Sequence, residues 1–440
     1  MRIQVITVGT TGSVAPYTGL AHRLLAEGHQ VELVTHAKFA KTVTCCGLTM
    51  RPLAADPFEA LINAHSQLGG QPGGHPGEGA WRAPSNAFRS LTNLRALVRT
   101  TEQGMLSLVD SILAAVDPTA DLLLLSTIAA PIASVIARYH GIASIGVFLQ
   151  PDAPTAEFSP CTMAWRGAGR ANIVRARAAN ALLDTLYRTA QRGLHARLGL
   201  AHRSGHRLRG ERERSRWPIW HGYSPWVVPR PADWRPGLHV AGYWWPHECL
   251  NWQPPALVTD FLAAGPPPVL IGFGSMMPGD PERLGEVAAQ ALRRAGLRGI
   301  VQSGWAGLAV IDDDVITVDA LPHGWLMPRT AAVVHHAGAG TTAAGLRAGV
   351  PAVPVPVMTD QPWWAARLVQ LGVAAEVLPY TELTSSRLAD ALTRAARSPD
   401  LARRAAAAAG LLAREDGAGA VARAVAELSG SRAGRPDLTI

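Results

Sequence analysis

The sequence predicts an α/β fold of two domains, each built on a parallel sheet with helices on both faces. Residues 2–9 form a short run of β-branched residues that ends in glycine, as expected of a strand. A stretch with helical spacing follows at Tyr17–Gly28, and a second apolar run follows at Val31–Thr35. The same alternation restarts near residue 268. A length of 440 residues exceeds the roughly 100–200 residues of one domain. Two such halves would face each other across a cleft, at the carboxyl ends of their strands.

The remaining elements of the first half follow the same strand–helix alternation. They are expected at Leu122–Ser126 (strand), Pro131–Tyr139 (helix) and Ile142–Phe148 (strand). A Gly/Pro stretch at 69–79 is expected to be a mobile loop, and residues 160–216 are expected to be mostly helical. We therefore expect a first domain at 1–228, followed by a Pro- and Trp-rich linker at 229–260.

The second half repeats short apolar runs separated by helical stretches. Strands are expected at Pro268–Phe273, Gly299–Ser303, Val315–Val318, Ala331–His335 and Ala352–Val357, and a helix at Pro281–Ala295. These elements predict a second domain at 261–425 and a flexible tail at 426–440.

Composition and charge restrict the function classes. The chain carries a net charge of +8, and its only lysines are Lys38 and Lys41. A basic protein can bind nucleic acid or an anionic small molecule, but no nucleic-acid-binding motif is present, so no nucleic-acid partner is expected. The start lacks the apolar core of a signal peptide, and no run is long and uninterrupted enough to predict a transmembrane helix. The four cysteines have no metal-ligand spacing. A reducing, cytoplasmic location is expected.

The most informative segment is residues 331–361. A buried strand ends at His335, and His336 opens a loop of small residues that leads into a helix ending near Gly349. Backbone N–H groups at such a helix start can approach an anion closely, and the helix dipole favours negative charge there. A diphosphate fits these donors.

Asp360 and Gln361 follow the next strand, at the same edge of the sheet. A carboxylate accepts hydrogen bonds and a carboxamide both accepts and donates them, so the pair suits vicinal sugar hydroxyls. Asp360 also precedes Pro362 and can cap a helix, and both functions can hold together.

These and other motifs resemble a GT-B glycosyltransferase of family 1, similar to bacterial sterol and antibiotic (macrolide- or glycopeptide-type) glucosyltransferases. The matching segments are Gly9-Thr-Thr-Gly-Ser-Val-Ala-Pro16, Gly242-Tyr-Trp244, Gly272-Phe-Gly-Ser275, Leu321-Pro-His-Gly-Trp-Leu326, His335-His-Ala-Gly-Ala-Gly-Thr-Thr342 and Asp360-Gln-Pro-Trp-Trp364. The resemblance is strongest over residues 268–380. It is weakest over 55–115 and 155–220, where the family varies with its acceptor.

The resemblance implies an inverting, metal-independent transfer of a sugar from a UDP- or TDP-sugar to a hydroxyl of an apolar natural product or sterol-like acceptor, with no cofactor. Asp360 and Gln361 would hold the donor sugar, and the backbone near Leu321 would meet the base. The residues implied to bind the diphosphate or to close on it are Thr10, Gly12, Gly274, Ser275, His336, Gly338, Gly340, Thr341 and Thr342. The run Asp312–Asp314 is interpreted as a polar turn, and no metal site is expected.

One departure from the family concerns catalysis. The acceptor-activating base of the family is an Asp or His at the position of Ser13, and a hydroxyl has no useful basicity near neutral pH. His36, His65 and His75 are candidate substitutes, because the first ends a strand, the second precedes the Gly/Pro loop and the third belongs to it. The acceptor could also need no base. The alternatives to a transferase are an auxiliary or inactive protein that binds nucleotide without turnover, and a nucleotide-sugar epimerase on the same architecture.

Overall fold

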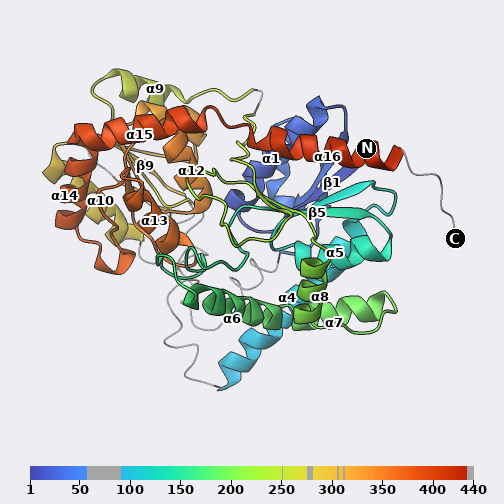
Figure 1. The fold of residues 1–440 in the computed structure, drawn as a ribbon. Coiled ribbons are helices and arrows are strands. Elements are labelled where there is room, and N and C mark those ends of the chain that lie inside the picture. The colour runs from blue at the N-terminus through green and yellow to red at the C-terminus, as the bar shows by residue number, and fades with distance from the viewer. Residues whose placement is uncertain (57–90, 250, 275–280, 305–306, 311–312, 434–440) are drawn as a thin grey trace.

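The computed structural model describes residues 1–56, 91–249, 251–274, 281–304, 307–310 and 313–433. It contains two parallel sheets, which lie in separate halves of the molecule (Figure 1). The first has strand order β3-β2-β1-β4-β5-β6-β7, and the second has order β10-β9-β8-β11-β12. In each sheet the chain first adds strands on one side of the starting strand, β1 or β8, and then continues on its other side with β4 or β11. Doubly wound sheets bind ligands at this switch point.

The first sheet is parallel throughout. Its strands are β1 (Arg2–Ile6), β2 (Gln30–His36), β3 (Thr49–Leu53), β4 (Leu122–Leu125), β5 (Ala143–Phe148), β6 (Ile219–His221) and β7 (Leu238–Val240). The helices of this half are α1 (Thr11–Ala26), α2 (Ala40–Thr44), α4 (Leu91–Ala115), α5 (Ala130–Tyr139), α6 (Ala171–Leu186), α7 (Arg188–Arg197) and α8 (Gly205–Arg214), with a 3-10 turn at Ala37–Phe39.

Alternating side chains explain why this sheet is covered on both faces. Ile6, Leu123 and Leu125 pack against α4, α5 and α7 on one face. Val5 and Leu124 pack against α1 on the other face. Successive residues of a strand point to opposite faces, so strands that are apolar throughout need helices on both.

The second half repeats this plan with fewer strands. These are β8 (Val269–Gly272), β9 (Gly299–Gln302), β10 (Val315–Val318), β11 (Ala332–His335) and β12 (Ala352–Pro354). The helices are α9 (Ala256–Ala263), α10 (Pro281–Ala295), α11 (His323–Leu326), α12 (Ala339–Ala348), α13 (Gln361–Gln370), α14 (Ser385–Arg397), α15 (Pro399–Leu412) and α16 (Gly417–Ala433), with 3-10 turns at Met327–Arg329 and Tyr380–Glu382.

Two segments differ from the domain limits expected from the sequence. The range expected to be a linker, 229–260, contains β7, which pairs in parallel with β6 and completes the first sheet. The last helix, α16, returns to the first half, where Val421 and Val425 pack against the same apolar face as α1 (Figure 1). The predicted tail at 426–440 is therefore helical up to Ala433, and residues 434–440 lie outside the described residues.

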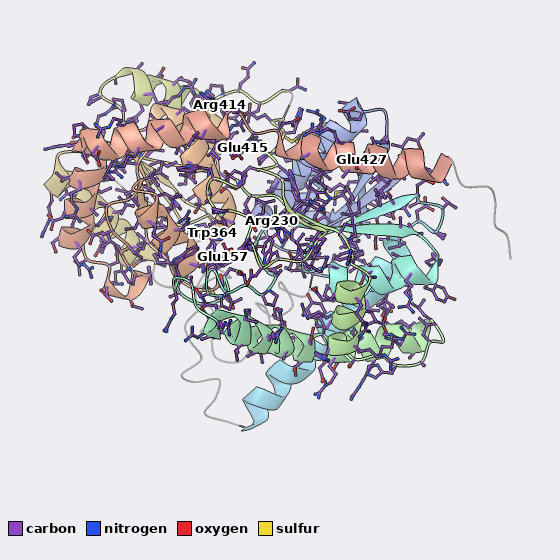
Figure 2. The ribbon with its side chains drawn as sticks, viewed as in Figure 1. Glu157, Arg230, Trp364, Arg414, Glu415 and Glu427 are labelled. Carbon is purple, nitrogen blue, oxygen red and sulfur yellow. A yellow bond between two sulfur atoms is a disulfide. The ribbon has the colours of Figure 1, made fainter. Side chains whose placement is uncertain are left out.

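An apolar contact joins the two halves. Trp363 of α13 is fully buried, packs against Phe158 and Trp165 of the segment after β5, and donates its indole N–H to the Ser159 carbonyl at 3.0 Å. The Ser224 hydroxyl donates to Glu415 at 2.5 Å across the same junction. Figure 2 shows Glu415 on the segment between α15 and α16. These contacts hold the two halves of the molecule close to each other.

The cysteines differ from the expectation of reduced thiols. Cys45, at the end of α2, forms a disulfide with Cys249, and their Cα atoms are 5.0 Å apart. Cys46 and Cys161 are free and buried. Sequence spacing could not reveal this pair, because its members are 204 residues apart. No helix within the described ranges is both long and apolar enough to cross a bilayer.

Candidate active site

The turn between β1 and α1 forms the first-half side of the site. Gly9 has φ +139°, and a Cβ there would lie 2.8 Å from the Ser13 side chain, so the turn requires glycine. Thr10 and Gly12 are exposed, and Ser13 is half-buried. The Thr7 hydroxyl donates to the Ser13 carbonyl at 2.6 Å and fixes the turn. The start of α1 is therefore held in one conformation, and its first residues are accessible to a ligand.

The start of α12 forms the facing side. Its N-cap residue, Gly338, provides no side-chain cap, so the first N–H groups of the helix are available to a ligand. A Cβ on Gly340 would lie 3.9 Å from the Gly12 Cα. The predicted diphosphate loop and the β1–α1 turn are thus brought together from opposite halves.

His336 is held between two glycines. A Cβ on Gly274 would lie 3.3 Å from the His336 ring, and one on Gly338 would overlap the ring. The Nδ1 atom of His336 is buried and has no hydrogen-bond partner among the described residues. Burial, with a smaller contribution from the charge of His323, lowers the pKa of His336 to about 4, so the imidazole is neutral at pH 7.

Some polar side chains beside His336 bond within the protein, and others keep atoms that a ligand could bond. His335 is buried, and its Nδ1 accepts the Ala337 N–H at 3.0 Å, which holds Ala337 at φ +61°. Thr341 is half-buried, whereas Thr342 is buried and its hydroxyl has no partner in the described part of the chain. His336 and Thr342 therefore both leave buried polar atoms for a ligand to satisfy.

Asp360 and Gln361 lie together at the start of α13. Trp364 donates its indole N–H to the Asp360 carboxylate at 3.0 Å. Burial raises the pKa of Asp360, and hydrogen bonds from Trp364 and from the Thr359 hydroxyl, which donates to Oδ1 at 3.1 Å, oppose that rise. The Gln361 Oε1 accepts two backbone N–H groups of the preceding turn, so any contact with a sugar falls to its amide nitrogen.

The remaining predicted residues lie in different parts of the molecule. The Leu321 carbonyl accepts from Gln302 at 3.5 Å, at the second-half edge where the base was expected. The buried ring of His36 lies 3.9 Å from the Asp56 carboxylate, an ion-pair distance that favours a structural role. Ser275, His65 and His75 lie outside the described residues.

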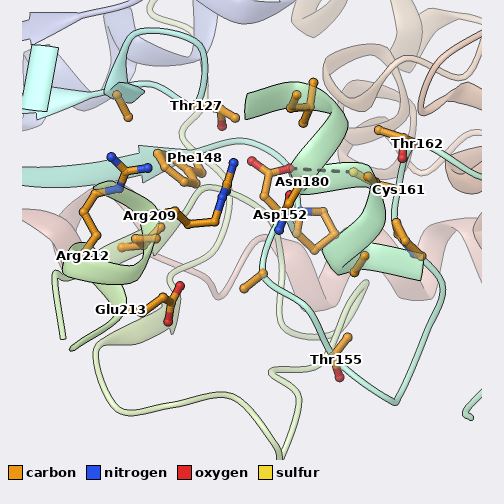
Figure 3. Close-up of a pocket in the computed structure, with 18 of the residues that line it drawn as sticks. Thr127, Phe148, Asp152, Thr155, Cys161, Thr162, Asn180, Arg209, Arg212 and Glu213 are labelled. Carbon is orange, nitrogen blue, oxygen red and sulfur yellow. Dashed lines mark hydrogen bonds between the residues drawn. The ribbon is translucent and has the colours of Figure 1, made fainter. Parts of the chain in front are cut away.

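The structure adds one carboxylate that sequence reasoning missed. Asp152 follows β5 and borders a cavity of about 180 Å³ between that strand and α6 (Figure 3). Its apolar lining includes Phe148, Phe158 and Leu183. The available signal was a carboxylate just after a predicted strand, but only the fold shows that this strand lies beside β4 and that α6 covers the end.

The described residues contain one group of side chains close enough to hold a metal ion. It consists of Cys45, Cys46 and Cys249, and two of these form the disulfide.

Both halves match known domain families. Residues 3–117 match the glycosyltransferase family 28 N-terminal domain. Residues 300–428 match the erythromycin biosynthesis protein CIII-like C-terminal domain.

Individual relatives agree with these matches. A sterol 3-beta-glucosyltransferase of Arabidopsis thaliana is 34% identical over 409 residues, which cover 89% of this chain and 60% of that protein. An O-mycaminosyltylonolide 6-deoxyallosyltransferase of Streptomyces fradiae is 43% identical over 189 residues, which cover 43% of this chain and 44% of that protein. The chain thus spans about 60% of the length of the plant relative.

Solved structures support the fold. The kitacinnamycin glycotransferase superposes with a TM-score of 0.65 at 18% identity and covers 97% of this chain and 98% of its own. The spinosyn forosaminyltransferase SpnP gives a TM-score of 0.67 at 16% identity, with 97% and 99% covered. The Streptomyces glycosyltransferase SsfS6, solved with thymidine diphosphate, gives 0.60 at 21% identity, with 97% and 99% covered. The chain therefore has the GT-B fold, and its two ends match a glycosyltransferase family 28 N-terminal domain and an erythromycin biosynthesis protein CIII-like C-terminal domain.

Proposed function

We propose that this protein transfers a sugar from a nucleoside diphosphate sugar to a hydroxyl of an apolar acceptor. One observation carries the proposal: the start of α12 meets the β1–α1 turn, and His336 and Thr342 keep unsatisfied buried polar atoms beside it. Sterol and macrolide relatives of the chain favour an apolar alcohol as acceptor.

The diphosphate would lie at the start of α12. There the helix dipole, the free N–H groups and the hydroxyl of Thr341 all favour negative charge. The neutral His336 would donate a hydrogen bond to a phosphate oxygen. Together these groups would stabilise the charge that builds up on the leaving diphosphate, and such electrostatic stabilisation often contributes most of the rate enhancement of an enzyme. Positive charge from a metal is not needed in this scheme.

The donor sugar would lie between Asp360 and the turn that contains Ser13. Asp360 would accept hydrogen bonds from sugar hydroxyls while Trp364 holds its second oxygen. The acceptor oxygen would attack the anomeric carbon on the face opposite the diphosphate, so the configuration inverts in a single displacement. The base would lie near Leu321, and either uracil or thymine fits the proposal.

Asp360→Asn tests the assignment, because asparagine keeps the size of the side chain and an oxygen that can accept the Trp364 N–H; the Asp360 side chain makes no capping hydrogen bond to α13. We expect turnover to fall about 10- to 100-fold, the loss of one charge-assisted hydrogen bond. Free UDP or TDP should bind within about twofold of wild type, because the carboxylate touches only the sugar. Calorimetry and initial rates measure the two quantities. If both fall together, Asp360 supports the local structure and does not bind the sugar.

A nucleotide-binding protein without turnover is the second candidate, favoured by Ser13 at the usual position of the base. It predicts that UDP or TDP binds at α12 while no acceptor is glycosylated.

A further inference from the structure

We propose that the Asp152 carboxylate takes the proton from the acceptor hydroxyl, within the cavity between β5 and α6. This inference rests on the proposed function and supplies the base that Ser13 cannot provide. Four features support it: the positions at which the strands end, the lining of the cavity, the contacts between the cavity and the donor site, and the groups around the carboxylate.

The strand order puts three polar residues side by side. β1, β4 and β5 are neighbours in the first sheet, and all run in parallel. Ser13, Thr127 and Asp152 each follow one of these strands, so they lie along the same carboxyl edge. Asp152 is the only one of the three with a basic group, and it lies two strands from the position at which the family keeps its base.

The cavity suits an apolar alcohol. Most of its lining is aromatic or aliphatic, and the Asp152 carboxylate, Arg209, Arg212 and Glu213 are also part of it (Figure 3). Its Oδ2 is buried and lacks a partner of good hydrogen-bond geometry among the described residues, while the Cys161 thiol lies 3.8 Å from Oδ1. A buried carboxylate oxygen without a hydrogen-bond donor is costly, and a hydroxyl donor from a ligand would satisfy it.

Several contacts connect this cavity to the donor site. Ile128 lines the cavity, and its side chain lies 3.8 Å from a Cβ built on Gly9, the residue that packs on Ser13. The charge of Asp360 also reaches Asp152 and raises its pKa. The charge of Asp152 reaches Tyr17, which shares a face of α1 with Ser13. A hydroxyl bound by Asp152 would therefore face the donor sugar.

The titratable and polar groups that face Asp152 come from each of the elements that pack against it. Thr127 follows β4, Arg209 belongs to α8, and Asp360 precedes α13. Burial is the main cause that raises the pKa of Asp152 to about 6; Asp360 adds to the rise, and Thr127, Arg209 and Cys161 oppose it. The neutral hydroxyls of Tyr17, Tyr187 and Tyr223 also lie within reach of its charge, and each has a raised pKa. Asp152 is therefore ionised at pH 7 yet basic enough to accept a proton.

The proposed step transfers one proton and one glycosyl group. The acceptor O–H bond breaks, and the proton moves to an oxygen of Asp152. The acceptor oxygen forms a bond to the anomeric carbon, the carbon–oxygen bond to the diphosphate breaks, and its electron pair leaves with the diphosphate.

Asp152→Asn tests this inference with two acceptors of different acidity. With an aliphatic sterol alcohol, we expect turnover to fall about 10²- to 10⁴-fold, the range of general-base catalysis. With a nitrophenol at a pH above its own pKa, no proton has to be removed, so variant and wild type should differ by less than about threefold. Asp110→Asn, an exposed carboxylate on α4, is the matched control and should change neither rate.

The pH profile and Ser13→Asp give independent readouts. Wild-type kcat/KM for the sterol alcohol should rise with pH and level off above about pH 6, since the ionised Asp152 is the active form. Asp152→Asn should remove that acidic limb. Ser13→Asp should raise turnover little, because a base is already present.

Three results would overturn the inference. An equal loss with both acceptors would make Asp152 a positioning or structural residue. Full activity of Asp152→Asn with the sterol alcohol would exclude it as the base. Nucleotide binding without turnover by the wild type, with either acceptor, would overturn the proposed function itself, and the role of Asp152 with it.

Discussion

At the scale of single residues, the site depends on groups that the fold buries without partners. His336 is the clearest case, because its Nδ1 is buried and unsatisfied among the described residues and its ring is neutral at pH 7. A bound diphosphate would accept a hydrogen bond from this ring.

His336→Ala should weaken UDP or TDP binding by about 1–3 kcal/mol, the value of a hydrogen bond to a charged group. The variant should melt close to wild type, because it removes a group whose Nδ1 has no partner among the described residues of the free protein. Calorimetric titration measures the loss, and His140→Ala, an exposed histidine beyond α5, serves as control. Unchanged affinity in a folded His336→Ala protein would refute the placement of the diphosphate.

The sequence predicted site residues well where they lie close together along the chain. His336, Gly338 and Gly340 lie within five residues, so one strand and one helix suffice to bring them together. The partners of His36 and Cys45 come from other segments, which no local pattern reveals. Asp152 was missed for the same reason, because its place beside the proposed site depends on which strands neighbour β5.

At the scale of elements, two helix starts contribute most of the proposed binding site. α1 and α12 begin beside each other from opposite halves, and their first residues are small. Small residues let backbone N–H groups approach an anion, which a side chain would keep at a distance.

Gly340→Val should therefore reduce UDP or TDP affinity at least about tenfold, because the branched side chain fills the gap towards Gly12 and shields the helix start. The matched control is Gly345→Ala in the same helix, where a Cβ meets no atom within 4 Å. That control should keep its affinity and gain about 0.5–1 kcal/mol of stability from the better helix former. Equal affinities of Gly340→Val and wild type would exclude this helix start as the binding site.

Most elements could be predicted, and the exceptions have physical reasons. The strands of the second half have nearly continuous apolar runs, which periodicity detects well. β7 has only three residues and follows a Pro-rich stretch, so its local signal is weak and its place depends on pairing with β6. α16 is rich in alanine and glycine, and sequence alone could not show that it returns to α1.

At the scale of the whole molecule, the proposed reaction needs both halves. The second half supplies the start of α12 and Asp360, whereas the first supplies the β1–α1 turn and the cavity at Asp152. Burial of Trp363 against Phe158 and the Ser224–Glu415 contact hold the halves in this arrangement. The sequence predicted two domains and a cleft, but not the shared apolar junction, which forms from segments about 200 residues apart in the chain.

The stereochemistry of the product tests the central claim most directly. The protein should be incubated with an α-linked UDP- or TDP-glucose and a sterol alcohol, and the anomeric proton of the product assigned by NMR. We expect a β-linked glycoside formed together with one nucleoside diphosphate, because the acceptor attacks opposite a diphosphate held at α12. An α-linked product, or nucleotide binding with no glycoside from any acceptor, would contradict it.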